Sequence, residues 1–267
     1  MSILANAEEG LDRETLRDVI DLALWAGQML LQSGAESQRV EETVHRLGTG
    51  LGCNWMDVLV SPNALVVTTI SGQEFRTKVR RVVNMGVNMN VLTEINRISR
   101  LVTAGSLDRL QLRAELERID KQAIPYRRWQ LVFMAGLSCA AISRLLDGNW
   151  PVFGVTFVAA SLASLTQQTL RKHAFNPFLT VVATAFAAGL IASSAALFGW
   201  SPHPEVAMVS AVLPLVPGVL LIDAAEDILK GHLVVGLVRG LTGGIISLAI
   251  ALGLLLAMWL TGIRNIG

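Results

Sequence analysis

Charge is scarce in the second half of the sequence. Residues 129–267 contain only 6 of the 22 lysines and arginines and 5 of the 21 aspartates and glutamates. So few charges cannot cover the surface of a water-soluble domain of this length, whereas long apolar runs are typical of a chain surrounded by lipid. This scarcity excludes an ordinary soluble domain there and predicts a membrane domain.

The sequence also contains only two cysteines, and its net charge is small. Cys53 and Cys139 have no ligand-like spacing around them, so we expect neither a disulfide framework nor a metal site. The formal net charge is only +1, which argues against a nucleic-acid partner because phosphate binding needs a basic surface. The first 30 residues are rich in charges and lack the apolar core of a signal peptide. We therefore expect the amino terminus to stay in the cytoplasm.

Recognisable catalytic motifs are missing as well. The sequence has no G-x-S-x-G elbow, Walker loop, zinc-protease motif or dinucleotide fingerprint, so we expect neither an enzyme nor a cofactor. Two other classes stay open: a membrane-anchored enzyme that uses Glu36, His45 or Glu94 as acid or base, and a regulatory or scaffold protein. The positions of these three residues on amphipathic helices suit packing or solvation better than catalysis.

Residues 1–125 show the periodicities of a charged α+β domain. Helical spacing begins after the expected N-cap Asp12 and stops at Gly34, and Ser71-Gly72 predicts a hairpin between two strands. Ser106 is the expected N-cap of the last helix. The other expected elements are a helix over 36–51, strands near 58–60, 65–70 and 75–80, and helices over 91–105 and 106–119.

Five later stretches are long and apolar enough to cross ~30 Å of hydrocarbon, which takes ~20 helical residues. The predicted fold class is therefore an α-helical polytopic membrane protein of about five transmembrane helices with an amino-terminal cytoplasmic α+β domain. The expected domains are 1–125 and 126–267. The expected spans are 129–146, 150–169, 178–198, 205–222 and 240–263.

Positive charges in the joints between spans predict the orientation. They occur before the first span, between the second and third, and between the fourth and fifth. The residues are Lys121, Arg127, Arg128, Arg171, Lys172, Lys230 and Arg239. The joints on the opposite side contain no lysine or arginine. The positive-inside rule then places the amino terminus in the cytoplasm and the carboxyl terminus outside.

The fourth span contains Pro214, Pro217 and Gly218 in its middle. The prolines remove two backbone donors and are expected to break the helix. A broken helix presents free amides near the midplane, where its partly positive end could face the carboxylate of a substrate. A packed proline kink without function fits the same residues equally well.

Ionisable residues next to the apolar spans are the other candidates for a substrate path. Asp223 and Asp227 fall on one helix face, and Arg239 lies at the start of the last span. Such groups are costly in lipid unless they pair or face a water-filled path. We expect substrate, proton or partner contact at Asp223 and Arg239 above all, and a solvated loop around Glu226 and Lys230.

Small residues recur at every fourth position on two spans. Such faces let helix backbones approach closely, either within a bundle or against a partner subunit. The two helix-packing faces consist of Gly236, Gly240 and Gly244 and of Ala185, Gly189 and Ser193.

Several phrases of the sequence, taken in order, resemble the threonine/serine exporter family. They are SGAES at 33–37, NALVVTTI at 63–70, GVNM at 86–89, GLSCA at 136–140, and LVPG at 215–218, followed by Asp227 and KGH at 230–232. The resemblance covers about residues 15–260. It follows most closely the larger subunit of a split, two-subunit form that is implicated in bacterial succinate export.

The resemblance implies an exporter of the bacterial cytoplasmic (inner) membrane, driven by an ion or proton gradient. Split members need a second, smaller membrane subunit, so the resemblance implies such a partner, and a homo-oligomer stays open. The implied substrate is a small carboxylate, with succinate or a related dicarboxylate first and threonine or serine second. The break in the fourth span and Arg239 would recognise the carboxylate that these substrates share.

Overall fold

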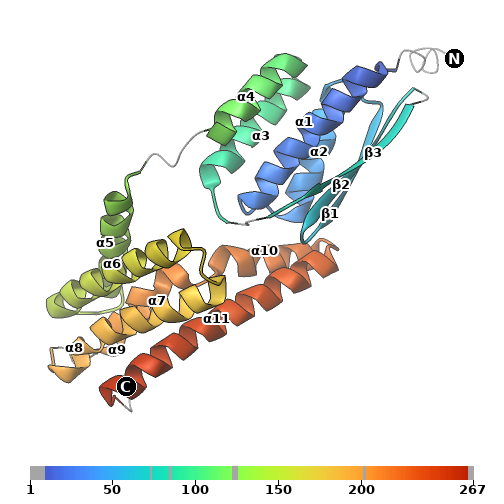
Figure 1. Cartoon of the computed structure of the whole chain (residues 1–267). Coiled ribbons are helices and arrows are strands. Elements are labelled where there is room, and N and C mark those ends of the chain that lie inside the picture. Colours follow the sequence, from blue (N-terminus) through green and yellow to red (C-terminus); the bar gives the residue numbers. More distant parts are fainter. Residues whose placement is uncertain (1–9, 73, 84–85, 122–125, 201–202, 264–267) are drawn as a thin grey trace. The chain divides into compact units, whose positions relative to one another are not determined.

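The computed structural model describes residues 10–72, 74–83, 86–121, 126–200 and 203–263 (Figure 1). Its contacts divide the chain into two compact units. Unit 1 comprises residues up to 123 together with 219–240, and unit 2 comprises 124–218 and 241–267. The expected domain boundary at 125/126 adjoins residues 122–125, which lie outside the described ranges. The segment 219–240, expected in the membrane domain, packs with the α+β elements.

The amino-terminal part of unit 1 contains the elements that the periodicities predict. The Asp12 carboxylate accepts hydrogen bonds from the backbone N–H groups of Glu14 and Thr15, so this residue is the cap of the first helix. The helix ends just before Gly34, whose φ of +83° favours glycine. The elements are α1 (Arg13–Gln32), α2 (Ser37–Gly50), β1 (Trp55–Ser61), β2 (Ala64–Ser71), β3 (Glu74–Arg81), α3 (Met89–Thr103) and α4 (Arg109–Lys121).

The start of α4 differs from the prediction. The helix begins at Arg109 and not directly after Ser106. The Asp108 carboxylate accepts a hydrogen bond from the Gln111 N–H at 2.7 Å, and the Gln111 side chain accepts one from the Asp108 N–H at 2.9 Å. This reciprocal pair satisfies two amides at the helix end, so Asp108 and not Ser106 is the capping residue.

The sheet is antiparallel, with strand order β1-β2-β3. Ser71 pairs with Glu74 across the β2–β3 hairpin, as the turn residues predict. Side chains on the inner face, including Met56, Val60 and Leu65, are buried with α1 and α2 in one hydrophobic core. The outer face is exposed.

Unit 2 is helical. Its core consists mainly of small residues, for example Ala159, Ala188 and Ala211. Its elements are α5 (Arg128–Leu145), α6 (Trp150–Lys172), α7 (Pro177–Ala192), α8 (Ser194–Leu197), α9 (Glu205–Val212), the 3-10 turn η1 (Leu213–Leu215) and the larger part of α11 (Leu233–Thr261). The remaining helix, α10 (Gly218–Leu229), lies in unit 1 except for its first residue.

The described residues include three helices long and apolar enough to cross a membrane, at 150–172, 177–197 and 233–261. A fourth span is reached if α9, η1 and α10 count as one interrupted span. The predicted first span forms a helix, α5, but its 18 residues include Arg128, Gln130 and Arg144 and are less apolar. The chain is therefore a mostly helical membrane protein with three to four candidate spans, and the fifth span stays a prediction.

Candidate functional site

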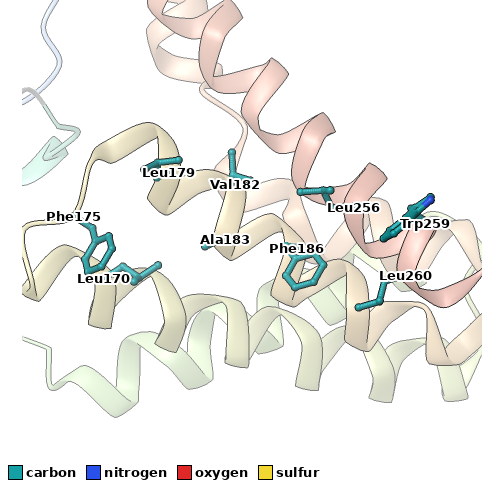
Figure 2. Close-up of a pocket in the computed structure, with 9 residues that line it drawn as sticks. All are labelled: Leu170, Phe175, Leu179, Val182, Ala183, Phe186, Leu256, Trp259 and Leu260. Atoms are coloured by element: carbon teal, nitrogen blue, oxygen red, sulfur yellow. The ribbon is translucent and has the colours of Figure 1, made fainter.

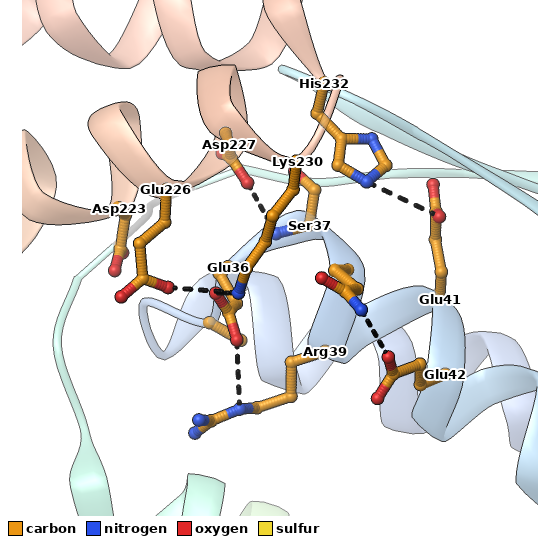
Figure 3. Close-up of polar contacts among 12 residues, drawn as sticks. Glu36, Ser37, Arg39, Glu41, Glu42, Asp223, Glu226, Asp227, Lys230 and His232 are labelled. Carbon is orange, nitrogen blue, oxygen red and sulfur yellow. Dashed lines mark hydrogen bonds and ion pairs between the residues drawn. The ribbon is translucent and has the colours of Figure 1, made fainter.

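The joint between α10 and α11 packs, within unit 1, against the loop that connects α1 and α2. Val235, near the start of α11, belongs to the same buried core as Leu16 and Val40 of the first two helices. Polar side chains from both sides gather around this contact (Figure 3). We call these side chains, together with the backbone groups of Ala35 and Ser37 that bond to them, the junction cluster. It consists of Ala35, Glu36, Ser37, Asp223, Asp227, Lys230 and Arg239.

A buried ion pair lies at the centre of the junction cluster. Arg239 Nη1 is 2.9 Å from Asp227 Oδ2 and 3.7 Å from Asp223 Oδ2. Asp227 is fully buried and Arg239 is 5% exposed. The 2.9 Å contact lacks the alignment of a hydrogen bond, and within the described ranges neither Nη1 nor Oδ2 has another hydrogen-bond partner. One guanidinium group therefore serves two carboxylates, and losing either member of the close pair would strand a buried charge.

The α1–α2 loop holds both members of this ion pair through its backbone. The Ser37 N–H donates a hydrogen bond to Asp227 Oδ1 at 2.9 Å (Figure 3). Arg239 Nη2 donates one to the Ala35 carbonyl oxygen at 2.8 Å. Both bonds are buried, and they join residues that are 190 and 204 positions apart in the sequence. The loop is thus a structural part of the site.

More exposed charges lie around Asp227 (Figure 3). The Lys230 ammonium group contacts the Glu36 carboxylate and lies 3.3 Å from Glu226, and His232 Nε2 lies 3.6 Å from Glu41. Burial raises the pKa of Glu36, but hydrogen bonds and the Lys230 charge outweigh it and hold that pKa below its usual range. Burial keeps the pKa of Glu41 above its usual range despite the opposing effect of His232.

Pro214, Pro217 and Gly218 form the interruption of the fourth span. The α-helical part before the break ends at Val212, the 3-10 turn covers Leu213–Leu215, and the next helix begins at Gly218. The helix is therefore broken where the prolines predict. A substrate role for these three residues stays a prediction, whereas Asp223, Asp227 and Arg239 are brought together.

The small-residue face at the start of α11 has three different surroundings. A Cβ atom added at Gly236 would lie 2.7 Å from the backbone oxygen of Ala224, so only glycine fits this approach to α10. Gly240 is in ordinary contact range of Ala224, at 3.8 Å for such an atom. Among the described residues, no atom lies within 4 Å of a Cβ at Gly244.

The small-residue face of α7 packs against the second half of α11 in unit 2. A Cβ atom at Gly189 would lie 2.8 Å from the Ala257 Cβ, and one at Gly253 would lie 2.5 Å from the Val182 backbone oxygen. The helices therefore touch through residues without bulk, as close packing in membranes requires. The facing sets are Ala185 and Gly189 on α7 with Ser193 directly after it, and Gly253, Ala257 and Thr261 on α11.

Sequence reasoning missed the contribution of the α1–α2 loop. It placed Glu36 on a solvated face and offered it as an acid or base, whereas the Glu36 carboxylate binds Lys230. A signal was present, because the phrases at 33–37 and 227–232 both belong to the set that carries the family resemblance. Nothing in either phrase indicates that the two meet.

The two other candidate acid–base residues have structural partners. His45 Nδ1 lies 2.7 Å from the Met56 carbonyl oxygen. Glu94 pairs with Arg97 and Arg118 at 3.1 and 2.7 Å. These contacts tie both residues to the packing and surface charge of unit 1.

A groove of about 490 Å³ lies in unit 2 beside α6, α7 and α11 (Figure 2). Apart from the indole of Trp259, its lining is hydrocarbon. It therefore offers little to bind a carboxylate, and the junction cluster is the better candidate. The lining residues are Leu170, Phe175, Leu179, Val182, Ala183, Phe186, Leu256, Trp259 and Leu260.

Comparisons with known proteins find similarity to membrane transport proteins. The family described as "Putative threonine/serine exporter" matches residues 21–261. The "Probable succinate transporter subunit YjjP" of Klebsiella aerogenes is 37% identical, over 95% of this chain and 98% of that protein. The protein of the same name in Escherichia coli is 36% identical, over 96% of this chain and 99% of that protein.

A longer relative matches at lower identity. The "Threonine/serine exporter" of Corynebacterium glutamicum is 26% identical over 92% of this chain, which spans only 53% of that protein. No solved structure matches the chain.

Proposed function

Because this chain belongs to the threonine/serine exporter family of membrane exporters, we propose that it is an exporter subunit whose junction cluster binds the carboxylate of a small metabolite. Succinate or a related dicarboxylate is the first candidate, since the two relatives named as succinate transporter subunits match over almost their whole length. It acts in the bacterial cytoplasmic membrane by secondary transport.

The observation that carries this proposal is the buried Arg239. Placing an arginine in a membrane-associated helix costs free energy. Such a residue is therefore found where it pairs with another group or faces a water-filled path. Its planar guanidinium group suits bidentate binding of a carboxylate. Among the described residues, no aligned hydrogen bond reaches Arg239 Nη1, although Asp227 and Asp223 both lie near it. A substrate carboxylate would compete with these two for the same donors.

Competition at Arg239 would also move the α1–α2 loop. Asp227 is held on its other oxygen by the Ser37 N–H, and Arg239 holds the Ala35 carbonyl oxygen. A substrate that displaces Asp227 from Arg239 weakens the attachment of the loop to α10 and α11. We infer that this loop reports the occupancy of the site to the rest of unit 1.

The proposed topology has five spans, with the amino terminus in the cytoplasm and the carboxyl terminus outside. The contact of Lys230 with Glu36 supports it, because the joint after the fourth span then lies on the same side as the α+β elements. Alkaline phosphatase and green fluorescent protein fused after residue 263 test it. Phosphatase activity with no fluorescence is expected, and the reverse pattern would leave an even number of spans.

A second, smaller membrane subunit is the proposed partner. Two relatives of matching length are named as subunits, and this chain spans about half of the longer exporter. The chain should be reconstituted in liposomes with and without a candidate small subunit, and efflux of labelled succinate measured. Flux only with both proteins supports the proposal, whereas equal flux from this chain alone contradicts the need for a partner.

Variants of the site test the carboxylate role. Arg239→Gln should reduce succinate flux by at least about tenfold, equivalent to ~1.4 kcal/mol, while the protein still reaches the membrane. Arg144→Gln is the control, because Arg144 lies at the end of α5 against Trp150. Normal flux in the Arg239 variant would remove that residue from the site. Pro217→Ala tests the helix break. If the transport rate and the substrate preference of this variant are unchanged, the break is a packed kink without a role in transport.

Threonine or serine export is the second candidate. The relative named for it is less similar, at 26% identity, yet these amino acids carry the same α-carboxylate that Arg239 would bind. Labelled threonine in the same liposomes separates the two. Flux of threonine that exceeds that of succinate would reverse our order.

A further inference from the structure

The outer face of the three-stranded sheet carries two rows of apolar side chains. The pairing register aligns Trp55 with Ile70 and Ile70 with Phe75, and two residues further along it aligns Thr68 with Thr77. The next row consists of Leu59, Val66 and Val79. Five of these six apolar side chains are between 42% and 66% exposed, so the part of the chain that the structure describes leaves this face largely uncovered.

The orientation of β3 makes this face unusual for a sheet edge. Lys78 points to the inner side, where it pairs with Asp21 of α1, and alternation places Arg76 and Arg80 on that side too. Phe75 and Val79 consequently point outward, where charged residues normally protect an edge strand. Contiguous exposed apolar rows of this kind mark an interaction surface.

The charge distribution favours a protein partner over a lipid surface. Three of the four basic side chains of β3 lie on the inner side of the sheet, so anionic headgroups facing the apolar rows would meet only Arg81. The central row of the outer face is polar and contains Asp57, whose carboxylate accepts a hydrogen bond from the Trp55 indole at 2.8 Å. A carboxylate in the middle of the face would repel an anionic membrane.

We propose that a second copy of this chain covers the face, by sheet-on-sheet packing about a two-fold axis parallel to β2. This axis places each row opposite the same row of the other copy, with β1 opposite β3. Trp55 then meets Phe75, Leu59 meets Val79, and the β2 residues meet themselves. Apolar rows contact apolar rows, as in the core of a β-sandwich.

The polar groups are also self-complementary in this arrangement. Asp57 lies opposite Thr77 of the other copy, and Arg81 lies opposite Ser61, so no like charges meet. The Thr68 and Thr77 hydroxyls are 2.9 Å apart. If Thr68 donates to Thr77, the Thr77 hydroxyl is free to donate to the carboxylate of the other copy. Two such bonds, related by the symmetry axis, fix the register.

The interface is small. Three strands ~4.8 Å apart, with about seven residues each at ~3.4 Å, give a face of only about 340 Å² in projection. That area is low for a stable dimer in dilute solution. It is sufficient where two copies are confined to one membrane, because confinement raises their effective concentration. The contact should therefore be sought in membranes, before detergent is added.

Cross-linking of a single introduced thiol tests the proposal. Thr68 lies on the axis, so Thr68→Cys brings two thiols face to face in the dimer, while Ala114→Cys on the exposed side of α4 does not. Membranes are treated with a short bis-maleimide, with the unaltered chain as background because Cys53 and Cys139 are buried. Thr68→Cys should give about tenfold more product of twice the chain mass than Ala114→Cys, since the interface holds its thiols at high effective concentration.

The apolar rows are tested in the same background. Adding Phe75→Ser and Val79→Ser to Thr68→Cys should abolish the product while the melting temperature stays unchanged, because both side chains are exposed. Three results would overturn the proposal: no excess over Ala114→Cys, a product that survives the two serines, or a product of another mass. A Thr68→Cys thiol shielded from a water-soluble maleimide without dimer would likewise assign the face to lipid or to residues 1–9.

Discussion

Helix α11 is packed in two different ways along its length. Its first turns, in unit 1, hold Arg239 in a buried ion pair with Asp227 and bond to the backbone of the α1–α2 loop. Its second half, in unit 2, meets α7 through Gly253 and Ala257 without any charge. Small-residue packing is insensitive to ligands, whereas an ion pair can be opened by a competing carboxylate. The same helix thus combines an uncharged packing segment with the charged segment that we propose a substrate opens.

The largest expected effect is a loss of stability when the ion pair at the first turns of α11 is changed. Asp227→Asn or Arg239→Gln alone should destabilise unit 1 by about 3–5 kcal/mol, because each leaves one buried charge unpaired. The double variant Asp227→Asn/Arg239→Gln removes both charges and should be much closer to the parent chain. Thermal unfolding in detergent measures all three. If the double variant loses as much unfolding free energy as the two single variants together, Asp227 and Arg239 are not paired.

A smaller effect is expected in the uncharged half. Gly253→Ala should cost about 1–3 kcal/mol, because its Cβ would lie 2.5 Å from the Val182 backbone oxygen and the helices would have to separate. Gly244→Ala is the matched control, since among the described residues nothing lies within 4 Å of its Cβ. Equal melting temperatures for the two variants would show that α7 and α11 are not in this contact.

The smallest effect concerns the partly buried charges around the ion pair, at Glu36 and Lys230. Because the folded state lowers the pKa of Glu36 from its ordinary value of 4.5, the Glu36 carboxylate stabilises the fold at neutral pH. This contribution is lost as the pH falls below 4.5 and passes through the lowered pKa. Glu36→Gln should therefore cost about 0–1 kcal/mol at neutral pH, and the difference from the parent chain should vanish in acid.

Glu117→Gln is the surface control for that measurement. Glu117 also pairs with a lysine, Lys121, but its side chain is 46% exposed and lies away from the junction cluster. A difference between Glu36→Gln and the parent chain that grows as the pH falls would contradict the assigned direction.

Local signals in the sequence predicted much of unit 1. The Asp12 cap, the stop at Gly34 and the hairpin at Ser71 depend on a few neighbouring residues, and the structure contains all three. The sequence could not predict which side chains of β3 point toward the core, because strict alternation is the same pattern whichever side is buried. Pairing of Lys78 with Asp21, 57 residues earlier, decides it.

The candidate site was predictable only in part, for the same physical reason. The spacing of Asp223 and Asp227 puts both on one helix face, and the cost of charge in lipid draws attention to Arg239. Their partners are the backbone groups of Ala35 and Ser37, and backbone atoms are common to every residue. No side-chain pattern could therefore have indicated a contact across 190 to 204 positions.

The most direct test of the central claim is succinate flux through the double variant Asp227→Asn/Arg239→Gln, reconstituted with the proposed small subunit. Both members of the close pair are removed, and the carboxylate that remains, Asp223, has a side chain that is 16% exposed and lies 3.7 Å from Arg239 in the parent chain, so a folded, membrane-inserted protein is expected. Our account predicts that its melting temperature stays near that of the parent chain while flux falls by at least about tenfold. Parental flux from the folded double variant would contradict the assignment of Arg239 as the carboxylate-binding residue.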